Sequence, residues 1–418
     1  MKITSQKIIF HIDVNSAFLS WTAITLLKEN KIDIDIRKIP SIVGGNSEDR
    51  KGVVLAKSIP AKKYDIKTGE PIAQAMKKCP GLKTFSPDHE VYRKFSNAMF
   101  NLLTAYSDYI ERYSIDEVFM DMSAYRSDYM EKAQEIKFRI EKELGFTVNV
   151  GIGNNKLLAK MASDFPKKNS IHIIMNDNIK EKMWPLPVGR LFMVGKSAEK
   201  KLRELNIFTI GDLANYNLNI LRTIFKSYGD VIYGYANGID NSEIKIYDEM
   251  DVKGIGNSST TRKDIVSDKE AYRLILALTE SVALRLRKNN TLCSQVSVSV
   301  KNNRFITYSH QKTAVTPTDS TTEIYELAVQ AFRECWKKEP IRQIGVRVGK
   351  LSDNRVYQKS IFDDDIIEKK RCLDKTIDQL REKFGDKAII RSTFLEDEDT
   401  SDKAGSAFTM AGLYESEK

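Results

Sequence analysis

The chain has 418 residues, 29% of them charged, and a formal net charge of +9. This length is enough for several domains with buried cores. Residues 396–418 contain seven acids and two bases, so residues 1–395 have a net charge of +14. A body this basic favours a polyanionic partner such as nucleic acid, although solvated surface lysines alone would give the same charge.

The composition argues against a cysteine-bound metal site and against a secreted or membrane-spanning protein. The cysteines, Cys79, Cys293, Cys335 and Cys372, have no metal-ligand spacing, which is typical of reduced thiols. No segment is long and apolar enough to span a membrane, and the N-terminus has no secretory signal. We therefore expect a soluble, cytoplasmic protein.

The first 175 residues predict an α+β layer. Hydrophobic periodicity indicates alternating strands and helices, and their order favours an antiparallel sheet. The expected elements are a strand at 8–14, a helix at 16–29, a mixed Lys-rich segment to 84, a helix at 92–110, a strand at 113–120, a helix at 130–144 and a strand at 146–152.

The remaining chain predicts a helical region followed by a second α+β unit. Residues 176–245 are expected to be all-helical, and a polar linker at 247–251 follows them. The second unit is expected to contain a helix at 268–288, strands at 294–301 and 304–310, a helix at 322–338 and a strand at 341–351. Beyond the second unit we expect one charged helix at 364–384. The composition of the last twenty or so residues is typical of a disordered segment.

Asp13 and the pair Asp116-Glu117 lie in apolar runs that predict strands. Carboxylates in such runs are costly unless they are paired or bind a cation. Three hard oxygen donors suit Mg²⁺ better than Zn²⁺, and such a cluster can hold two ions for in-line phosphoryl transfer. Neighbouring residues of a regular strand face opposite sides, so Asp116 and Glu117 can share a site only near a turn or a twist of the strand. The alternative is a polar strand end or hairpin.

A glycine-rich motif and a hairpin motif follow. Val150-Gly151-Ile152-Gly153-Asn154-Asn155-Lys156 leads from a strand into a helix whose N-terminus could favour an anion, with a tight turn as the alternative. It lacks the Gly-Lys-Ser/Thr ending of a Walker A loop. Residues 191–213 resemble a helix-hairpin-helix element, whose backbone N–H groups hold a DNA phosphate. Met193 occupies the place of its usual first glycine, and a plain helical hairpin is the alternative.

A short apolar peptide, Gln358-Lys359-Ser360-Ile361-Phe362, follows the second α+β unit. Two large apolar side chains in a charged segment suit docking into a pocket of a partner. Packing of Ile361 and Phe362 back onto the body is the alternative.

These motifs, in this order and spacing, resemble the Y-family DNA polymerases, the translesion enzymes of the impB/mucB/samB type, over the chain to about residue 395. The sequences that match are His11-Ile12-Asp13-Val14-Asn15-Ser16-Ala17-Phe18, Tyr113-Ser114-Ile115-Asp116-Glu117-Val118-Phe119, Gly151 to Lys156, Asp164 to Asn169 and the hairpin at Val194. Asp-Val-Asn at the first site is similar to the DNA polymerase V branch, and other stretches are similar to DNA polymerase IV.

The resemblance implies a multidomain α+β fold of the right-hand polymerase type. The implied parts are a ferredoxin-like palm at 1–17 and 85–175, small fingers at 18–84, a helical thumb with the helix-hairpin-helix at 176–245, a linker at 246–251, an α+β little finger at 252–354 and a tail at 355–418.

The resemblance also implies site residues. Asp13, Asp116 and Glu117 would hold two Mg²⁺ ions with the Val14 carbonyl, and Phe18 would be the steric gate that excludes a ribose 2′-OH. Further contacts are implied to the nucleotide by Ala17, Lys62 and Lys167, to DNA by Val194, Gly195, Lys196, Thr261 and Arg262, and to the sliding clamp by Gln358, Ser360, Ile361 and Phe362. The family's Tyr-x-x-Arg motif is Ile59-Pro60-Ala61-Lys62 here, so the hydroxyl and the bidentate charge are both lost.

From the resemblance we expect a template-directed DNA polymerase that adds dNTPs to a primer 3′-OH. Low-fidelity lesion bypass in an SOS response, the absence of a proofreading exonuclease, and a monomer at the bacterial nucleoid are implied by the family. Two alternatives stay open. A nucleotidyl cyclase could use a similar metal site, and a non-catalytic relative could serve as a DNA scaffold.

Overall fold

The computed structural model describes residues 7–45, 52–165, 169–246, 252–353, 365–385 and 388–394. These residues form two compact units, one from the N-terminal part up to residue 246 and one from residue 252 onward. No helix in these ranges is long and apolar enough to cross a membrane.

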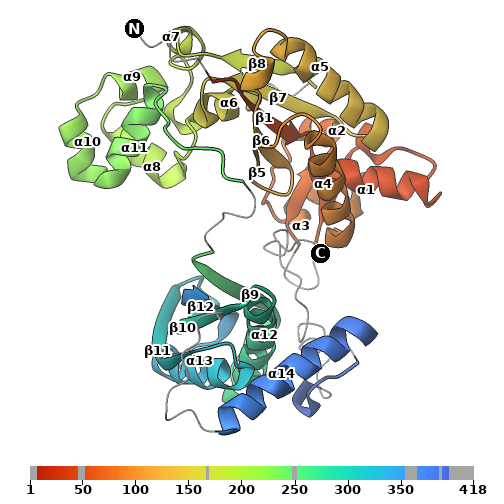
Figure 1. The fold of residues 1–418 in the computed structure, drawn as a ribbon, viewed down its shortest axis with the longest axis vertical. Coiled ribbons are helices and arrows are strands. Elements are labelled where there is room, and N and C mark those ends of the chain that lie inside the picture. Colours follow the sequence, from red (N-terminus) through yellow and green to blue (C-terminus); the bar gives the residue numbers. More distant parts are fainter. Residues whose placement is uncertain are drawn as a thin grey trace. The chain divides into compact units, whose positions relative to one another are not determined.

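A five-stranded sheet is the centre of the first unit, with strand order β5-β6-β1-β7-β8. Its strands are β1 (Ile9–Val14), β5 (Ile110–Arg112), β6 (Glu117–Asp121), β7 (Val148–Gly153) and β8 (Ile171–Ile174). The helices around it are α1 (Ala17–Lys28), α4 (His89–Leu103), α5 (Tyr129–Arg139) and α6 (Lys156–Ser163). Figure 1 shows β1, which is buried along its whole length, between β6 and β7.

The three predicted strands, β1, β6 and β7, pair antiparallel as expected, but the sheet has two strands that were not predicted, β5 and β8, and β8 makes it a mixed sheet. The strands β5, β6, β1 and β7 pair antiparallel, whereas β8 runs parallel to β7. The physical reason is the connection, because α6 crosses over between β7 and β8 and such a crossover returns the chain in the same direction.

Two predicted boundaries in this region are also wrong. The helix expected at 92–110 ends at Leu103, and residues 110–112 form β5. The strand expected at 113–120 begins only at Glu117, because the N–H groups of Tyr113 and Ser114 both donate to the Glu117 carbonyl and close a turn. The helix expected at 130–144 is α5 followed by a π-helical turn at Ile140–Leu144.

A smaller sheet and a helical region complete the first unit. The strands β2 (Ser41–Gly44), β3 (Val54–Lys57) and β4 (Lys83–Phe85) form a three-stranded sheet with α2 (Ile59–Lys62) and α3 (Ile72–Lys78). The expected helical region contains α7 (Ile179–Lys182), α8 (Lys196–Glu204), α9 (Ile210–Ala214), α10 (Leu218–Phe225) and α11 (Ser227–Ala236). Its core includes Leu157, Leu158 and Met161, so this region packs against α6.

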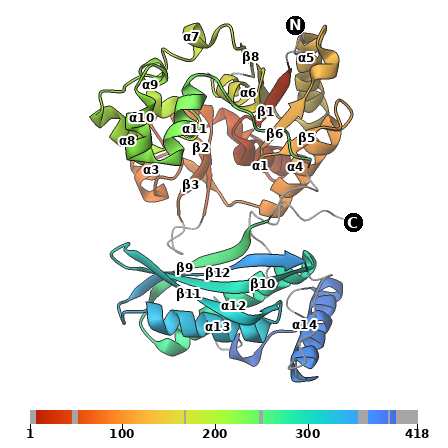
Figure 2. The same ribbon diagram turned by 60° about the vertical axis from the view of Figure 1, so that its left-hand side comes forward.

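The second unit is a four-stranded antiparallel sheet with helices against one face (Figure 2). Its elements are β9 (Gly254–Ile265), α12 (Asp268–Lys288), β10 (Thr291–Asn302), β11 (Thr307–Thr318), α13 (Thr321–Cys335), β12 (Ile341–Asp353) and α14 (Asp365–Phe384). The strand order is β11-β10-β12-β9. The sequence analysis missed β9, whose Gly, Ser, Asn and Thr residues have no clear apolar alternation. It also placed β11 three residues early, because Asn302 turns the chain by accepting from the N–H groups of Arg304 and Ile306.

Candidate active site

The end of β1 and the start of β6 bring the first and second acidic motifs together. Asp13, which is 3% exposed, lies opposite Glu117 in the register of β1 and β6. The N–H group of Val14 donates to the Asp116 carbonyl at 3.0 Å. The sheet therefore places the backbones of all three acidic residues side by side, although more than a hundred residues separate Asp13 from the other two.

Asp116 lies in the turn between β5 and β6, and Glu117 is the first residue of β6. The Asp116 carboxylate accepts from the Ser114 hydroxyl at 2.7 Å, which fixes the side chain within this turn. Because Asp116 precedes the regular strand, the alternation of side chains does not apply to the pair, and both residues line one cavity.

The sequence analysis missed Lys160, which forms an ion pair with Glu117. Lys160 lies on α6 with 9% of its side chain exposed, and Asp164 is 3.8 Å from its Nζ atom. Burial alone would lower the pKa of Lys160, but the carboxylates of Glu117, Asp164 and Asp13 outweigh burial and raise the pKa above its ordinary value. A single lysine inside the apolar stretch Leu157–Ala162 was the signal in the sequence.

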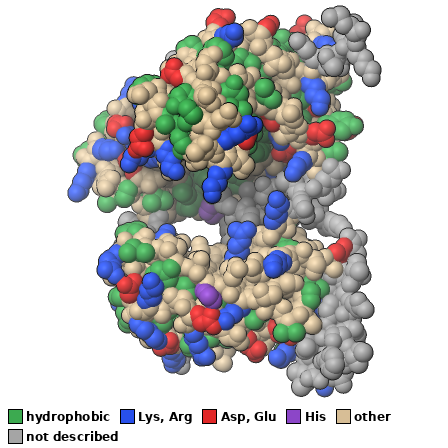
Figure 3. Space-filling model, turned by 90° about the vertical axis from the view of Figure 1, so that its left-hand side faces the viewer, with side chains coloured by type: hydrophobic (Ala, Val, Ile, Leu, Met, Phe, Trp, Pro, Cys, Tyr) green, Lys and Arg blue, Asp and Glu red, His purple; other side chains and the backbone are tan. Residues whose placement is uncertain are grey.

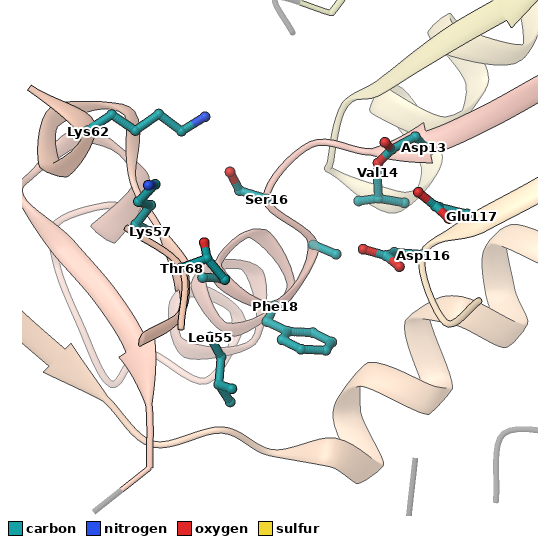
Figure 4. A pocket seen from close by; sticks show the side chains of 12 residues that line it. Asp13, Val14, Ser16, Phe18, Leu55, Lys57, Lys62, Thr68, Asp116 and Glu117 are labelled. Atoms are coloured by element: carbon teal, nitrogen blue, oxygen red, sulfur yellow. The ribbon is translucent and has the colours of Figure 1, made fainter. Parts of the chain in front are cut away.

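A cavity of about 320 Å³ lies between the carboxylates and the smaller sheet. In Figure 4, Asp13, Asp116 and Glu117 lie at one side of the cavity, and Lys57 and Lys62 lie at the other. The other residues that line it are Val14, Ser16, Ala17, Phe18, Leu55, Ala56 and Thr68. The cavity therefore has an acidic end and a basic end.

Phe18 lines the cavity from the first turn of α1. Its ring stacks on Tyr92 of α4, with centroids 4.6 Å apart and planes 10° apart. Tyr92 is fully buried, and its hydroxyl is 2.8 Å from the Thr22 hydroxyl. The gate residue expected from the sequence is thus held by a buried aromatic side chain that the sequence analysis did not select.

The chemistry of the donors fits a hard divalent cation, because three carboxylates and the Val14 carbonyl are all oxygen ligands. Within the described ranges, however, no group of three or more His, Cys, Asp or Glu side chains is gathered closely enough to hold a metal ion. The Glu117 carboxylate is paired with Lys160 in this structure.

The glycine-rich motif packs a helix against a strand and does not form a phosphate loop. A Cβ atom on Gly151 would lie 2.0 Å from the Ala159 carbonyl oxygen. The N-terminus of α6 is already occupied, since the Asn155 side chain accepts from Leu158 N–H and Asp240 accepts from Leu157 N–H at 3.1 Å. An anion was one of the two possibilities at this helix N-terminus, but these N–H groups already have side-chain acceptors and are not open to it.

In the hairpin expected at 191–213, Met193 adopts the backbone conformation that the usual first glycine of the motif would adopt. Met193 has φ +73°, a left-handed conformation that glycine adopts without strain. The N–H group of Val194 donates to the Leu191 carbonyl at 3.0 Å within the turn. Gly195 is the N-cap of α8 and Lys196 is its first residue, so their positions suit a phosphate contact better than that of Val194.

The other predicted contacts are distributed over the two units. Thr261 and Arg262 lie on β9, where Thr261 is buried and donates to the Arg342 carbonyl while Arg262 is exposed. Lys167 and the peptide Gln358–Phe362 lie outside the described residues. Lys and Arg side chains occur over the visible face of each unit (Figure 3).

Comparison with known proteins agrees with this arrangement. A model of the impB/mucB/samB family matches residues 12–164, a model of its C-terminal domain matches residues 252–361, and a model of its helix-hairpin-helix motif matches residues 176–207. The chain belongs to the impB/mucB/samB family. The expected membership of the Y-family DNA polymerases is confirmed, and with it the enzyme class, a DNA-directed DNA polymerase.

Relatives of the family match over nearly the whole chain. The chain is 49% identical to the DNA polymerase IV of Clostridium acetobutylicum over 94% of this chain and 100% of the relative. It is 37% identical to the DNA polymerase IV of Acetivibrio thermocellus over 94% and 98%. In fold it is similar to a Y-family DNA polymerase chimera, with a TM-score of 0.71 and 22% identity over 83% of this chain and 100% of that structure.

Proposed function

We propose that this impB/mucB/samB protein extends a DNA primer by one dNTP at a time, opposite a template, in the cavity between Asp13 and Lys62. The observation that supports this proposal is the polarity of the cavity, with carboxylates at one end and lysines at the other. A triphosphate that spans such a cavity presents its reacting phosphate to the acidic end and its leaving phosphates to the basic end.

In the proposed reaction the primer 3′-oxygen forms a bond with the α-phosphate, and the bond between the α- and β-phosphates breaks. The 3′-hydroxyl proton goes to solvent, and pyrophosphate leaves with the electron pair. Two Mg²⁺ ions, when bound by Asp13, Asp116, Glu117 and the Val14 carbonyl, supply positive charge beside the reacting phosphate. Lys62, and Lys167 outside the described ranges, neutralise the leaving group.

Phe18 selects the sugar in this proposal. Its ring is fixed by Tyr92 at the wall of the cavity, where it occupies the space that a 2′-hydroxyl would need. Lesion bypass at low fidelity is part of the proposal and rests on the resemblance to the family. A role in the SOS response, synthesis without proofreading and a clamp contact through Gln358–Phe362 are further parts of the proposal.

Asp116→Asn tests the proposal, because it removes one anionic ligand and keeps the size of the side chain. Primer extension with Mg²⁺ should fall by about a hundredfold or more, the usual loss when one charge at the reacting centre is removed. Asp108→Asn is the matched control, since Asp108 is exposed and lies outside the cavity.

Three results would contradict parts of the proposed function. Extension by Asp116→Asn at the wild-type rate would remove Asp116 from the reaction. A cyclic nucleotide formed from NTP without a primer would favour the cyclase, and DNA binding by the wild-type protein without extension would favour the scaffold.

A further inference from the structure

Lys57 is a cavity residue that the family's Tyr-x-x-Arg motif does not include. It is the last residue of β3, and it lines the basic end of the cavity together with Lys62 of α2. Ile59, at the tyrosine position of the motif, is 67% exposed and does not line the cavity. The chain has therefore lost one polar group of the motif and has a second lysine nearby.

The corner between β3 and α2 fixes both lysines toward the cavity. Ser58 is 1% exposed, and its hydroxyl oxygen accepts from Ser41 N–H and Ala61 N–H, each at 3.1 Å. The same hydroxyl donates to the Ile39 carbonyl at 2.7 Å. Because this buried residue joins the strand to the helix, it holds the backbone segments that carry Lys57 and Lys62 together.

The charge of Lys57 has no carboxylate partner among the described residues. Its Nζ atom donates to the neutral carbonyl of Ile66. The nearby carboxylate of Glu70 is already bound to Lys78, with a distance of 2.6 Å between Nζ and Oε2. In the described ranges Lys62 forms no ion pair either, so two like charges face one cavity without an anion between them.

The pKa of Lys57 reflects this arrangement. Burial lowers the pKa below its ordinary value, and the charge of Lys62 lowers it further, while Glu70 and Asp65 act in the opposite direction. A bound polyphosphate would relieve the repulsion between the two lysines, and groups with a perturbed pKa in a cavity are common at functional sites.

We propose that Lys57 binds the β- and γ-phosphates of the incoming dNTP together with Lys62. This inference rests on the proposed function of the same cavity. Lys57 supplies a polar contact to the phosphates that Ile59, which has no hydroxyl, cannot supply. The triphosphate is then bound by one residue of β3 and one residue of α2.

Lys57→Gln removes the charge, while its amide can still donate to the Ile66 carbonyl. Steady-state primer extension with varied dNTP should show a KM about tenfold higher, as for the loss of one charged hydrogen bond, with a smaller change in kcat. Lys57→Arg should stay near the wild type. Lys63→Gln is the matched control, since Lys63 is exposed and lies outside the cavity.

Inhibition by inorganic pyrophosphate separates binding from a structural role. Lys57→Gln should raise the inhibition constant of pyrophosphate by a similar factor, with unchanged thermal unfolding and unchanged affinity for primer–template DNA. An unchanged KM and an unchanged pyrophosphate constant would overturn the assignment of Lys57. If Lys57→Gln left both constants unchanged but Asp116→Asn abolished extension, the proposed function would stand without Lys57. A wild-type protein that does not extend a primer would overturn both the proposed function and the role of Lys57.

Discussion

Phe18 shows how a single residue at this site depends on its support. Its ring stacks on Tyr92, and Tyr92 is held by Thr22 from the same helix as Phe18. The position of the Phe18 ring is therefore set by a buried contact between α1 and α4. A similar dependence applies to Glu117, whose carboxylate is held by Lys160.

Phe18→Ala should admit ribonucleotides, because it removes the ring from the wall of the cavity. We expect the preference for dNTP over rNTP, measured as the ratio of kcat/KM values, to fall by at least about a hundredfold, as for the loss of a steric barrier of ~3 kcal/mol. Phe138→Ala is a control, since Phe138 is exposed on α5 outside the cavity. Unchanged sugar discrimination in Phe18→Ala would exclude this residue as the gate.

At the scale of elements, the close contact between β7 and α6 positions the acidic end of the cavity. Gly151 and Gly153 let α6 approach the sheet, and α6 presents Lys160 to Glu117. The glycines of this motif are thus required for packing, and the helix that they admit supports the site.

Gly151→Ala should destabilise the first unit, because its Cβ atom would lie 2.0 Å from a carbonyl oxygen and 2.4 Å from the Ser163 nitrogen. Backbone atoms cannot move aside cheaply, so we expect a loss of about 3 kcal/mol in the free energy of unfolding, measured by denaturant titration. For Gly81→Ala, where no atom lies within 4 Å, the change should stay within about 0.5 kcal/mol. Equal stability of the two variants would refute this packing argument.

The charged helix expected at 364–384 is a docked element of the second unit. Asp374 is 5% exposed and accepts from Thr321 N–H at 2.8 Å, and Arg287 of α12 reaches both Asp374 and Asp378. Arg371 binds Asp319 in the same way from the other side of the contact. The sequence predicted a charged helix here without a partner for its charges, and the tertiary structure pairs them with Arg287 of α12 and with Asp319 just before α13.

Asp374→Ala should release α14, since it leaves Arg287 and the Thr321 N–H group without this partner. Because Arg287 keeps its closer partner Asp378, the main loss is the hydrogen bond to the buried Thr321 N–H, which costs about 1–3 kcal/mol and should be visible as faster hydrogen exchange in α14. The exposed Glu382→Ala on the same helix serves as the reference variant. Protection of α14 that is equal in both variants would show that Asp374 does not hold it.

For the whole molecule, the excess of positive charge predicts how DNA is bound. Residues 1–395 have a net charge of +14, and Lys and Arg side chains occur on the visible face of each unit. Contacts with phosphates depend on counterion release and are indifferent to base sequence.

The affinity for primer–template DNA should therefore fall steeply with salt. For six or more phosphate contacts we expect a loss of on the order of a thousandfold between 50 and 200 mM salt, measured by fluorescence anisotropy. Two primer–template duplexes of unrelated sequence should give the same slope. A weak salt dependence, or a clear preference for one sequence, would contradict this mode of binding.

The sequence by itself was enough to select candidates for the site. Asp13, Asp116 and Glu117 could be selected because carboxylates in apolar runs are visible without a fold, whereas Phe18 was selected through the family resemblance. The order of strands and helices followed from periodicity, although its boundaries failed where turns are closed by backbone hydrogen bonds, as at Tyr113 and Ser114.

Only the tertiary structure decided which other residues join the site. Lys57, Tyr92 and Lys160 lie in elements whose local sequences resemble an ordinary strand or helix. The fold places Lys57 at the cavity, Tyr92 against the cavity residue Phe18, and Lys160 against the cavity residue Glu117. The structure also decided that the glycine-rich motif packs α6 and that α14 is docked through ion pairs. These properties depend on contacts between residues that are distant in sequence, and local patterns do not encode such contacts.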